Sequence, residues 1–204
     1  MWGHETVKEY VEVIDRQSLR LKKLVMDVIE ASKAVTGNIS PVMNPLDIRE
    51  LLSQAVGEYE ERLQKHQLEV VINTENRRRG QDGDIQEEES EAWIVMADGD
   101  RLWRVFDNLL SNICKYSAGN RVYIELQQSE EDFIIIFKNI SRDRLNITEE
   151  ELFERFVRGD AARHMEGSGL GLTIARSLTE LMGGKLVIEI EGDMFRAKIS
   201  FKKI

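Results

Sequence analysis

A run of glycines that opens an apolar helix pattern constrains this chain more than any other feature. The run is Gly167-Ser-Gly-Leu-Gly-Leu172. The apolar residues that follow at helical spacing are Leu172, Ile174, Ala175, Leu178, Leu181 and Met182. Glycines just before a helix leave backbone N–H groups uncovered beside the positive end of the helix dipole, where polyphosphate binds well. By itself such a run is more typical of a tight turn, so it indicates a phosphate site only together with other features.

A second apolar helix pattern lies upstream of the glycine run. Its apolar positions are Leu102, Val105, Phe106, Leu109, Leu110 and Ile113. Asp98 or Asp100 is placed to cap its N-terminus. Asn108, Asn112 and Lys115 are spaced i, i+4 and i+7, so they share one helix face. An amide oxygen can ligate Mg²⁺, and a lysine can neutralise phosphate oxygens. Without the glycine run, an ordinary polar outer face would be the better interpretation.

The two segments together resemble the catalytic and ATP-binding domain of bacterial sensor histidine kinases, in the gyrase/heat-shock-chaperone/kinase ATPase superfamily. Asn108-Leu-Leu-Ser-Asn-Ile-Cys-Lys-Tyr-Ser117 is similar to the N box of that family. Phe153-Glu-Arg-Phe156 is similar to its F box, and Gly167 to Leu172 is similar to its G2 box. The order and spacing of all three boxes match the family. The resemblance extends over roughly residues 5 to 204, which is nearly the whole chain.

The resemblance implies ATP and Mg²⁺ as cofactors, and it assigns residues to them. Asn112 is the implied Mg²⁺ ligand, with Asn108 beside it, and both are grouped with Lys115 as catalytic residues. Lys115 and Tyr116 are expected to face the phosphates. The other residues assigned to the nucleotide site are Asn139, Arg158, Arg163, Gly167, Gly169, Leu170, Gly171 and Leu172. Of these, the two arginines are expected to reach the γ-phosphate from a lid, and the three glycines to supply backbone donors and the lid hinge.

The chain departs from the family where an Asp-x-Gly-x-Gly motif, the G1 box, normally follows the central strand. Spacing from Phe153 leads to Asn139-Ile-Ser-Arg-Asp143, so Asn replaces Asp and both glycines are absent. In the family that Asp accepts a hydrogen bond from the adenine amino group. Asn139 keeps an acceptor oxygen without the charge, so a weaker contact to the base is expected. The alternative is that Asn139 merely ends a strand.

Composition limits the class of protein. The net charge of −9 argues against a nucleic-acid surface, and the single cysteine, Cys114, excludes a disulfide framework. The longest apolar run, Phe133 to Phe137, is too short to cross a bilayer.

The expected strands are Leu68–Ile72, Trp93–Ala97, Arg121–Gln127, Asp132–Lys138, Lys185–Glu191 and Met194–Lys202. The last two are expected to form a hairpin with Gly192-Asp193 at or near its turn. Pro45-Leu46-Asp47 are expected to open a helix whose apolar side runs from Ile48 to Leu63. With the intervening helices, these strands predict an α+β fold in which a mixed sheet packs on helices as a two-layer sandwich.

The sequence pattern of residues 5 to 36 predicts one long helix before that domain. Val7, Ile14, Leu21 and Val28 occupy one heptad position, and Tyr10, Gln17, Leu24 and Ala31 occupy the other. Such a seam needs a partner, and it is similar to the second helix of the kinase dimerisation domain. We therefore expect residues 1–39 to belong to a homodimerising phosphoacceptor domain and residues 40–204 to form the catalytic domain. The alternative is an amphipathic helix that lies on its own domain.

None of the three histidines has the sequence context of the family's phosphoacceptor. His4 is followed by an acidic residue but not by the expected proline, while His66 follows an amphipathic helix and His164 lies in the expected lid. We therefore expect a fragment that lacks its acceptor helix and does not autophosphorylate alone. It would be the cytoplasmic portion of a membrane-bound sensor.

The function implied by these patterns is a protein histidine kinase. It would transfer the γ-phosphate of ATP to a His on another helix, for relay to the receiver domain of a response regulator. One alternative is a degenerate nucleotide-binding or scaffold module, which the altered G1 box favours. A hydrolytic ATPase of the same superfamily is disfavoured, because those enzymes carry a basic Glu where Asn108 stands, and Asn cannot act as a general base.

Overall fold

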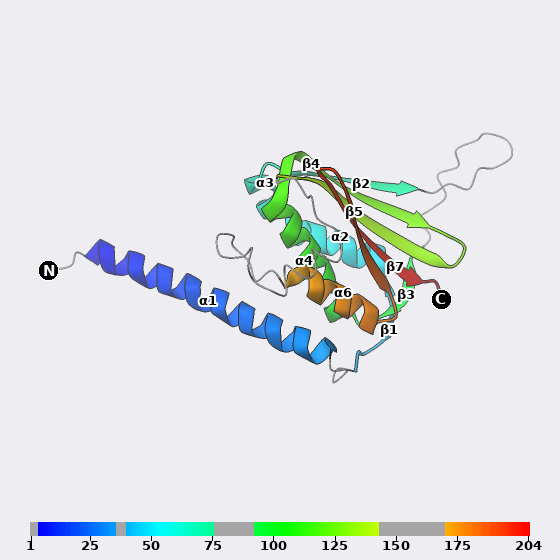
Figure 1. The fold of residues 1–204 in the computed structure, drawn as a ribbon, viewed down its shortest axis with the longest axis horizontal. Helices are drawn as coiled ribbons and strands as arrows, with labels where there is room; N and C mark the ends of the chain where they lie inside the picture. Colours follow the sequence, from blue (N-terminus) through cyan, green and yellow to red (C-terminus); the bar gives the residue numbers. More distant parts are fainter. Residues whose placement is uncertain (1–3, 36–39, 76–91, 143–169) are drawn as a thin grey trace.

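The computed structural model of the chain describes residues 4–35, 40–75, 92–142 and 170–204. A five-stranded mixed sheet forms one layer and helices form the other (Figure 1). In spatial order the strands are β2 (Glu69–Glu75), β4 (Ser117–Gln128), β5 (Asp132–Ser141), β7 (Met194–Lys202) and β6 (Lys185–Glu191). Only β2 and β4 run parallel, and the other neighbours are antiparallel. The predicted two-layer α+β fold is therefore confirmed.

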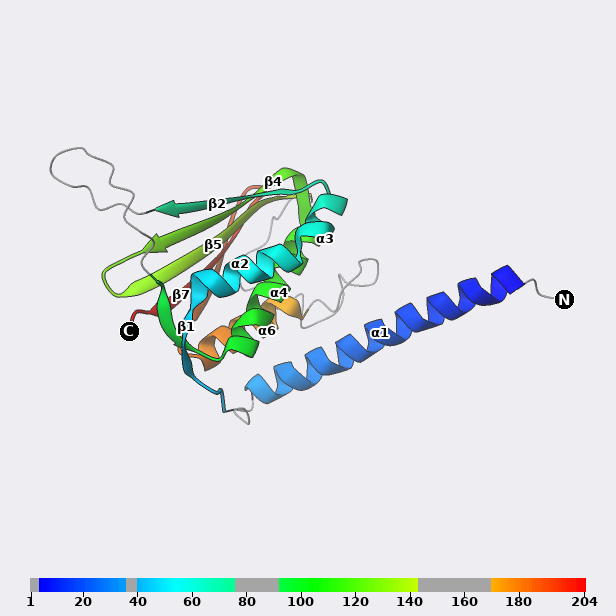
Figure 2. The same cartoon turned by 180° about the vertical axis from the view of Figure 1, so that it is seen from behind.

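Helices α2 (Ile48–Glu58), α4 (Gly99–Tyr116) and α6 (Gly171–Leu181) cover one face of the sheet (Figures 1 and 2). Along β5, side chains alternate so that Phe133, Ile135, Phe137 and Asn139 are buried under these helices. All six apolar positions predicted for the helix at 102–113 are buried in the core. The period of 3.6 in the helices and of two in the strands therefore produces a single apolar layer between them.

A small second sheet joins the start of the domain to α4. Strand β1 (Asn44–Asp47) pairs antiparallel with β3 (Ile94–Ala97). Asp98 then caps α4, because its carboxylate accepts from Arg101 N at 3.2 Å. The same carboxylate accepts from Val42 N at 2.9 Å, so one buried acid ties the incoming chain to the helix.

Two local expectations differ from the structure. Pro45 to Asp47 were expected to open a helix, but they lie in β1, and the helix begins at Ile48 with Asp47 as its N-cap. The helical pattern that continues through Leu63 is split at Tyr59 into α2 and the short α3 (Glu60–Lys65). The predicted hairpin at the C-terminus is confirmed, with Gly192 at φ +60 in its turn, a backbone angle that favours glycine.

Helix α1 (His4–Val35) extends away from the sandwich and contacts α6 (Figure 1). Its predicted seam is open wherever its side chains are described, with exposed fractions of 50% at Val7, 55% at Tyr10, 63% at Ile14 and 61% at Leu21. Of the described helices, none is both long and apolar enough to span a membrane.

Candidate functional site

The two sequence features that predicted a phosphate site meet in the fold. Helix α4 packs against α6, and Gly171 at the start of α6 lies directly against Asn108 of α4. A Cβ atom on Gly171 would lie 3.0 Å from Asn108 Oδ1. The Asn108 Nδ2 donates to Arg104 O at 2.9 Å, one turn earlier in α4. Asn108 therefore sits between the two helices, with its nitrogen turned to its own helix and its oxygen toward the start of α6.

Asn112 and Lys115 follow Asn108 along the same face of an unbroken α4. Asn112 is half-buried, and its amide forms no side-chain hydrogen bond to any other described residue. Lys115 is exposed, and Tyr116 is half-buried, which raises the pKa of its phenol. This face therefore presents an amide, an ammonium and a neutral phenol in the order that was predicted.

The start of α6 contributes backbone rather than reactive side chains. Leu172 is buried in the core with 4% of its surface exposed, and Leu170 packs partly against the core. Any contact that Leu172 makes with a ligand would therefore come chiefly from its backbone N–H, in the first helical turn. Arg158, Arg163, Gly167 and Gly169 lie outside the described residues, as does the F box.

Asn139 lies within β5, two residues before the strand ends at Ser141, on the buried face of the sheet and with 4% of its surface exposed. Its Oδ1 has no hydrogen-bond partner, while its Nδ2 donates to Ile140 O at the long distance of 3.4 Å. Two other buried oxygens in the described part of the chain also lack partners: Ser117 Oγ, where α4 passes into β4, and Thr173 Oγ1, in the first turn of α6. A buried acceptor without a donor is costly, so each of these atoms is a point where a ligand or water can supply a partner.

The predicted nucleotide and metal ion fit this set of residues. A 6-amino purine can donate to Asn139 Oδ1, which has no partner in the fold. Among the described residues no three His, Cys, Asp or Glu side chains gather to bind a metal. The amide oxygen of Asn112 would hold Mg²⁺ together with phosphate oxygens and water, which commonly complete the shell of this ion beside nucleotides.

Sequence reasoning missed one buried contact next to the site. The Tyr59 hydroxyl donates to the Asp107 carboxylate and lies 3.0 Å from Asp107 O, and Asp107 directly precedes Asn108. Burial, and then the hydrogen bond to Asp107, raise the pKa of Tyr59 well above its ordinary value. Arg62 lies over the Tyr59 ring at 4.6 Å. These contacts hold the break between α2 and α3 against α4. The hydrogen bond joins residues 48 positions apart in the sequence, so no local sequence pattern predicts it.

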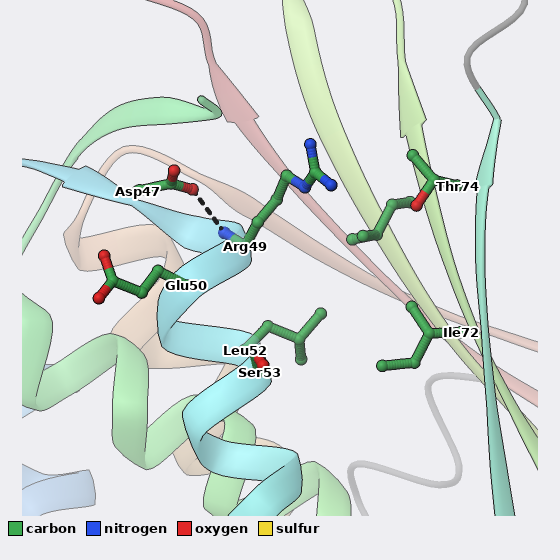
Figure 3. A pocket seen from close by; sticks show the side chains of 8 residues that line it. Asp47, Arg49, Glu50, Leu52, Ser53, Ile72 and Thr74 are labelled. Atoms are coloured by element: carbon green, nitrogen blue, oxygen red, sulfur yellow. Dashed lines mark hydrogen bonds between the residues drawn. The ribbon is translucent and has the colours of Figure 1, made fainter. Parts of the chain in front are cut away.

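A cavity of about 320 Å³ lies elsewhere, between the start of α2 and the edge strand β2 (Figure 3). Leu52 and Ile72 face each other across it, and Asp47, at its rim, accepts from Arg49 N at 2.9 Å. None of the predicted site residues lines this cavity. Leu126, which does, lies four residues further along β4 than Val122, the partner of Asn139, so the cavity is displaced along the sheet from Asn139.

Comparison with known proteins agrees with this geometry. The model of the histidine kinase-, DNA gyrase B- and HSP90-like ATPase family matches residues 97–203, which is more than half of the chain. The chain therefore belongs to this ATPase family. It is 29% identical over 187 residues to the sensor protein VanS of Enterococcus faecium, covering 89% of this chain and 44% of VanS. The chain spans less than half the length of the curated relatives compared with it.

Solved structures show the same fold. Full-length ShkA in complex with AMPPNP superposes with a TM-score of 0.74 at 21% identity, covering 97% of this chain and 39% of ShkA. Histidine kinase ThkA in complex with the response regulator protein TrrA gives a TM-score of 0.70 at 21% identity, covering 100% of this chain and 53% of that one. At these identities the likeness concerns the fold.

Proposed function

We propose that this chain is the ATP-binding catalytic domain of a sensor histidine kinase. It transfers the γ-phosphate of ATP to a His on a dimerisation helix outside these 204 residues, for relay to the receiver domain of a response regulator. The observation that carries the proposal is the contact between Asn108 and Gly171, which brings the N-box helix and the last glycine of the G2 box together in a chain of this ATPase family.

The site residues divide the chemistry by type. Asn112 ligates Mg²⁺ through its amide oxygen, Lys115 neutralises phosphate charge, and Asn139 accepts from the base. Arg158 and Arg163 reach the γ-phosphate, and backbone N–H groups from Gly167 to Leu172 bind phosphate oxygens. Phosphoryl transfer depends mainly on such positioning and charge neutralisation, so no general base in this chain is needed.

The same proposal extends to assembly. The exposed apolar seam of α1 supports a homodimer formed through residues 1–39, and the ThkA structure, which contains TrrA, supports a response regulator as the second protein partner. The catalytic domain then occupies residues 40–204. We place it on the cytoplasmic side of a membrane-bound sensor.

A scaffold module without kinase activity is the alternative, and only the altered G1 box favours it, with Asn139 in the place of the family's Asp and both glycines absent. Autophosphorylation with γ-³²P-labelled Mg·ATP separates the two. The 204-residue chain alone is expected to stay unlabelled, because none of its three histidines has the acceptor context. A longer form that restores an acceptor helix upstream of residue 1 is expected to take an acid-labile label, and to lose it in Asn112→Ala. A longer form that binds ATP without becoming labelled would favour the scaffold, and label at His4 would contradict the assignment of the acceptor.

A further inference from the structure

The amide of Asn139 is held loosely, although the residue is buried. Among the described residues, its Oδ1 has no partner, and its Nδ2 has only a 3.4 Å contact to the carbonyl of Ile140. A half-turn about the Cβ–Cγ bond exchanges Oδ1 and Nδ2 in space. The fold therefore offers little resistance to presenting either end of the amide.

An amide and a carboxylate differ in which hydrogen-bonding groups of a purine they can bind. A carboxylate at this position only accepts hydrogen bonds, so it suits a 6-amino purine and repels a 6-oxo purine. An amide accepts with its oxygen and donates with its nitrogen. Asn139 can therefore present Oδ1 to the amino group of ATP, or Nδ2 to the carbonyl oxygen of ITP or GTP.

We propose that Asn139 makes the base site tolerant at the 6-position of the purine, so that the domain binds 6-oxo as well as 6-amino purine nucleoside triphosphates. This inference rests on the proposed function, because it takes Asn139 to be the residue that contacts the base. Asn139 would then determine the base specificity of the site, and an Asp in its place would remove the tolerance for 6-oxo purines.

ITP is the most informative nucleotide for this test, because it differs from ATP only at the 6-substituent and the adjacent ring nitrogen. Unlike GTP, it has no 2-amino group. Calorimetry would compare Mg·ATP and Mg·ITP on wild type, Asn139→Asp and Asn139→Ala, with thermal unfolding of each variant as the check on folding. Wild type is expected to bind the two nucleotides within about tenfold of each other. Asn139→Asp is expected to increase the preference for ATP by a further tenfold or more, because an unmatched buried acceptor is costly.

The outcomes are distinct. A wild-type preference for ATP as strong as that of Asn139→Asp would overturn the inference and leave the proposed function standing. Failure of wild type to bind either nucleotide would overturn both. Should Asn139→Asp not fold, Asn139→Ala decides: weaker binding of both nucleotides by a similar factor supports the inference, and unchanged affinity for both overturns it.

Discussion

Removal of the Tyr59 hydroxyl should destabilise the domain by about 2 kcal/mol. In Tyr59→Phe the ring keeps its packing and its contact with Arg62, while the hydrogen bond to Asp107 is lost. Hydrogen bonds to charged groups contribute about 1.5 to 3 kcal/mol, and the loss leaves a part-buried carboxylate short of a donor. For a chain of this size the change corresponds to a decrease in Tm of about 4 to 8 °C.

Urea denaturation at pH 7 would measure this free energy of unfolding. Tyr123→Phe is the matched control, since Tyr123 is 38% exposed on β4 and water can replace any partner of its hydroxyl. Asp107→Asn keeps an acceptor but removes the charge, so a loss of about 1 kcal/mol is expected there. In the double variant with Tyr59→Phe, the two losses should be less than additive by about 1 kcal/mol.

The pH dependence gives a second readout. The raised pKa of Tyr59 means that folding favours its neutral form. The contribution of neutral Tyr59 to the free energy of unfolding is complete below the ordinary tyrosine pKa of about 10, and it is lost as the pH rises above that value. Wild type should therefore lose more stability than Tyr59→Phe between pH 9 and about 11. Equal stability of the two proteins at pH 7, together with parallel pH profiles, would refute the role assigned to this contact.

Three glycine substitutions test the packing of the domain and of the site. Gly184→Ala should cost about 1 to 3 kcal/mol in urea denaturation, because its Cβ would lie 2.5 Å from the ring of Phe201; retained stability would contradict this packing. Gly171→Ala should leave stability within about 1 kcal/mol of wild type but weaken ATP binding several-fold in calorimetry, since the new methyl group displaces Asn108; unchanged affinity would argue against this placement. Gly57→Ala, the control in open space on α2, should stabilise the protein by about 0.5 to 1 kcal/mol and leave ATP binding unchanged.

Local sequence patterns predicted most of the framework. The apolar spacing in α4 identified its buried face, and its first turn identified Asp98 as a possible cap. The predicted bounds of the two C-terminal strands, β6 and β7, match the observed ones, because apolar alternation and a turn glycine are both local signals. These signals are reliable because each depends on neighbours within a few residues.

The differences arise where distant residues decide the local structure. Pro45 to Asp47 extend because they pair with β3, which no local pattern indicates. The helix breaks at Tyr59, whose hydroxyl donates a hydrogen bond to Asp107, far along the chain. For the site, spacing predicted one face with Asn112 and Lys115, but not that Asn139 would be buried with its oxygen unpaired.

The most direct test of the central claim is the affinity for ATP with and without Mg²⁺, measured by calorimetry on wild type, Asn112→Ala and a control, Asn73→Ala. Asn73 is an exposed residue of β2, so its amide can be removed without touching the site. We predict that Mg²⁺ tightens ATP binding in wild type and Asn73→Ala, and that Asn112→Ala loses this gain. Equal Mg²⁺-dependent affinity in all three proteins would contradict the assignment of Asn112 as the metal ligand, and no ATP binding by wild type would contradict the nucleotide site itself.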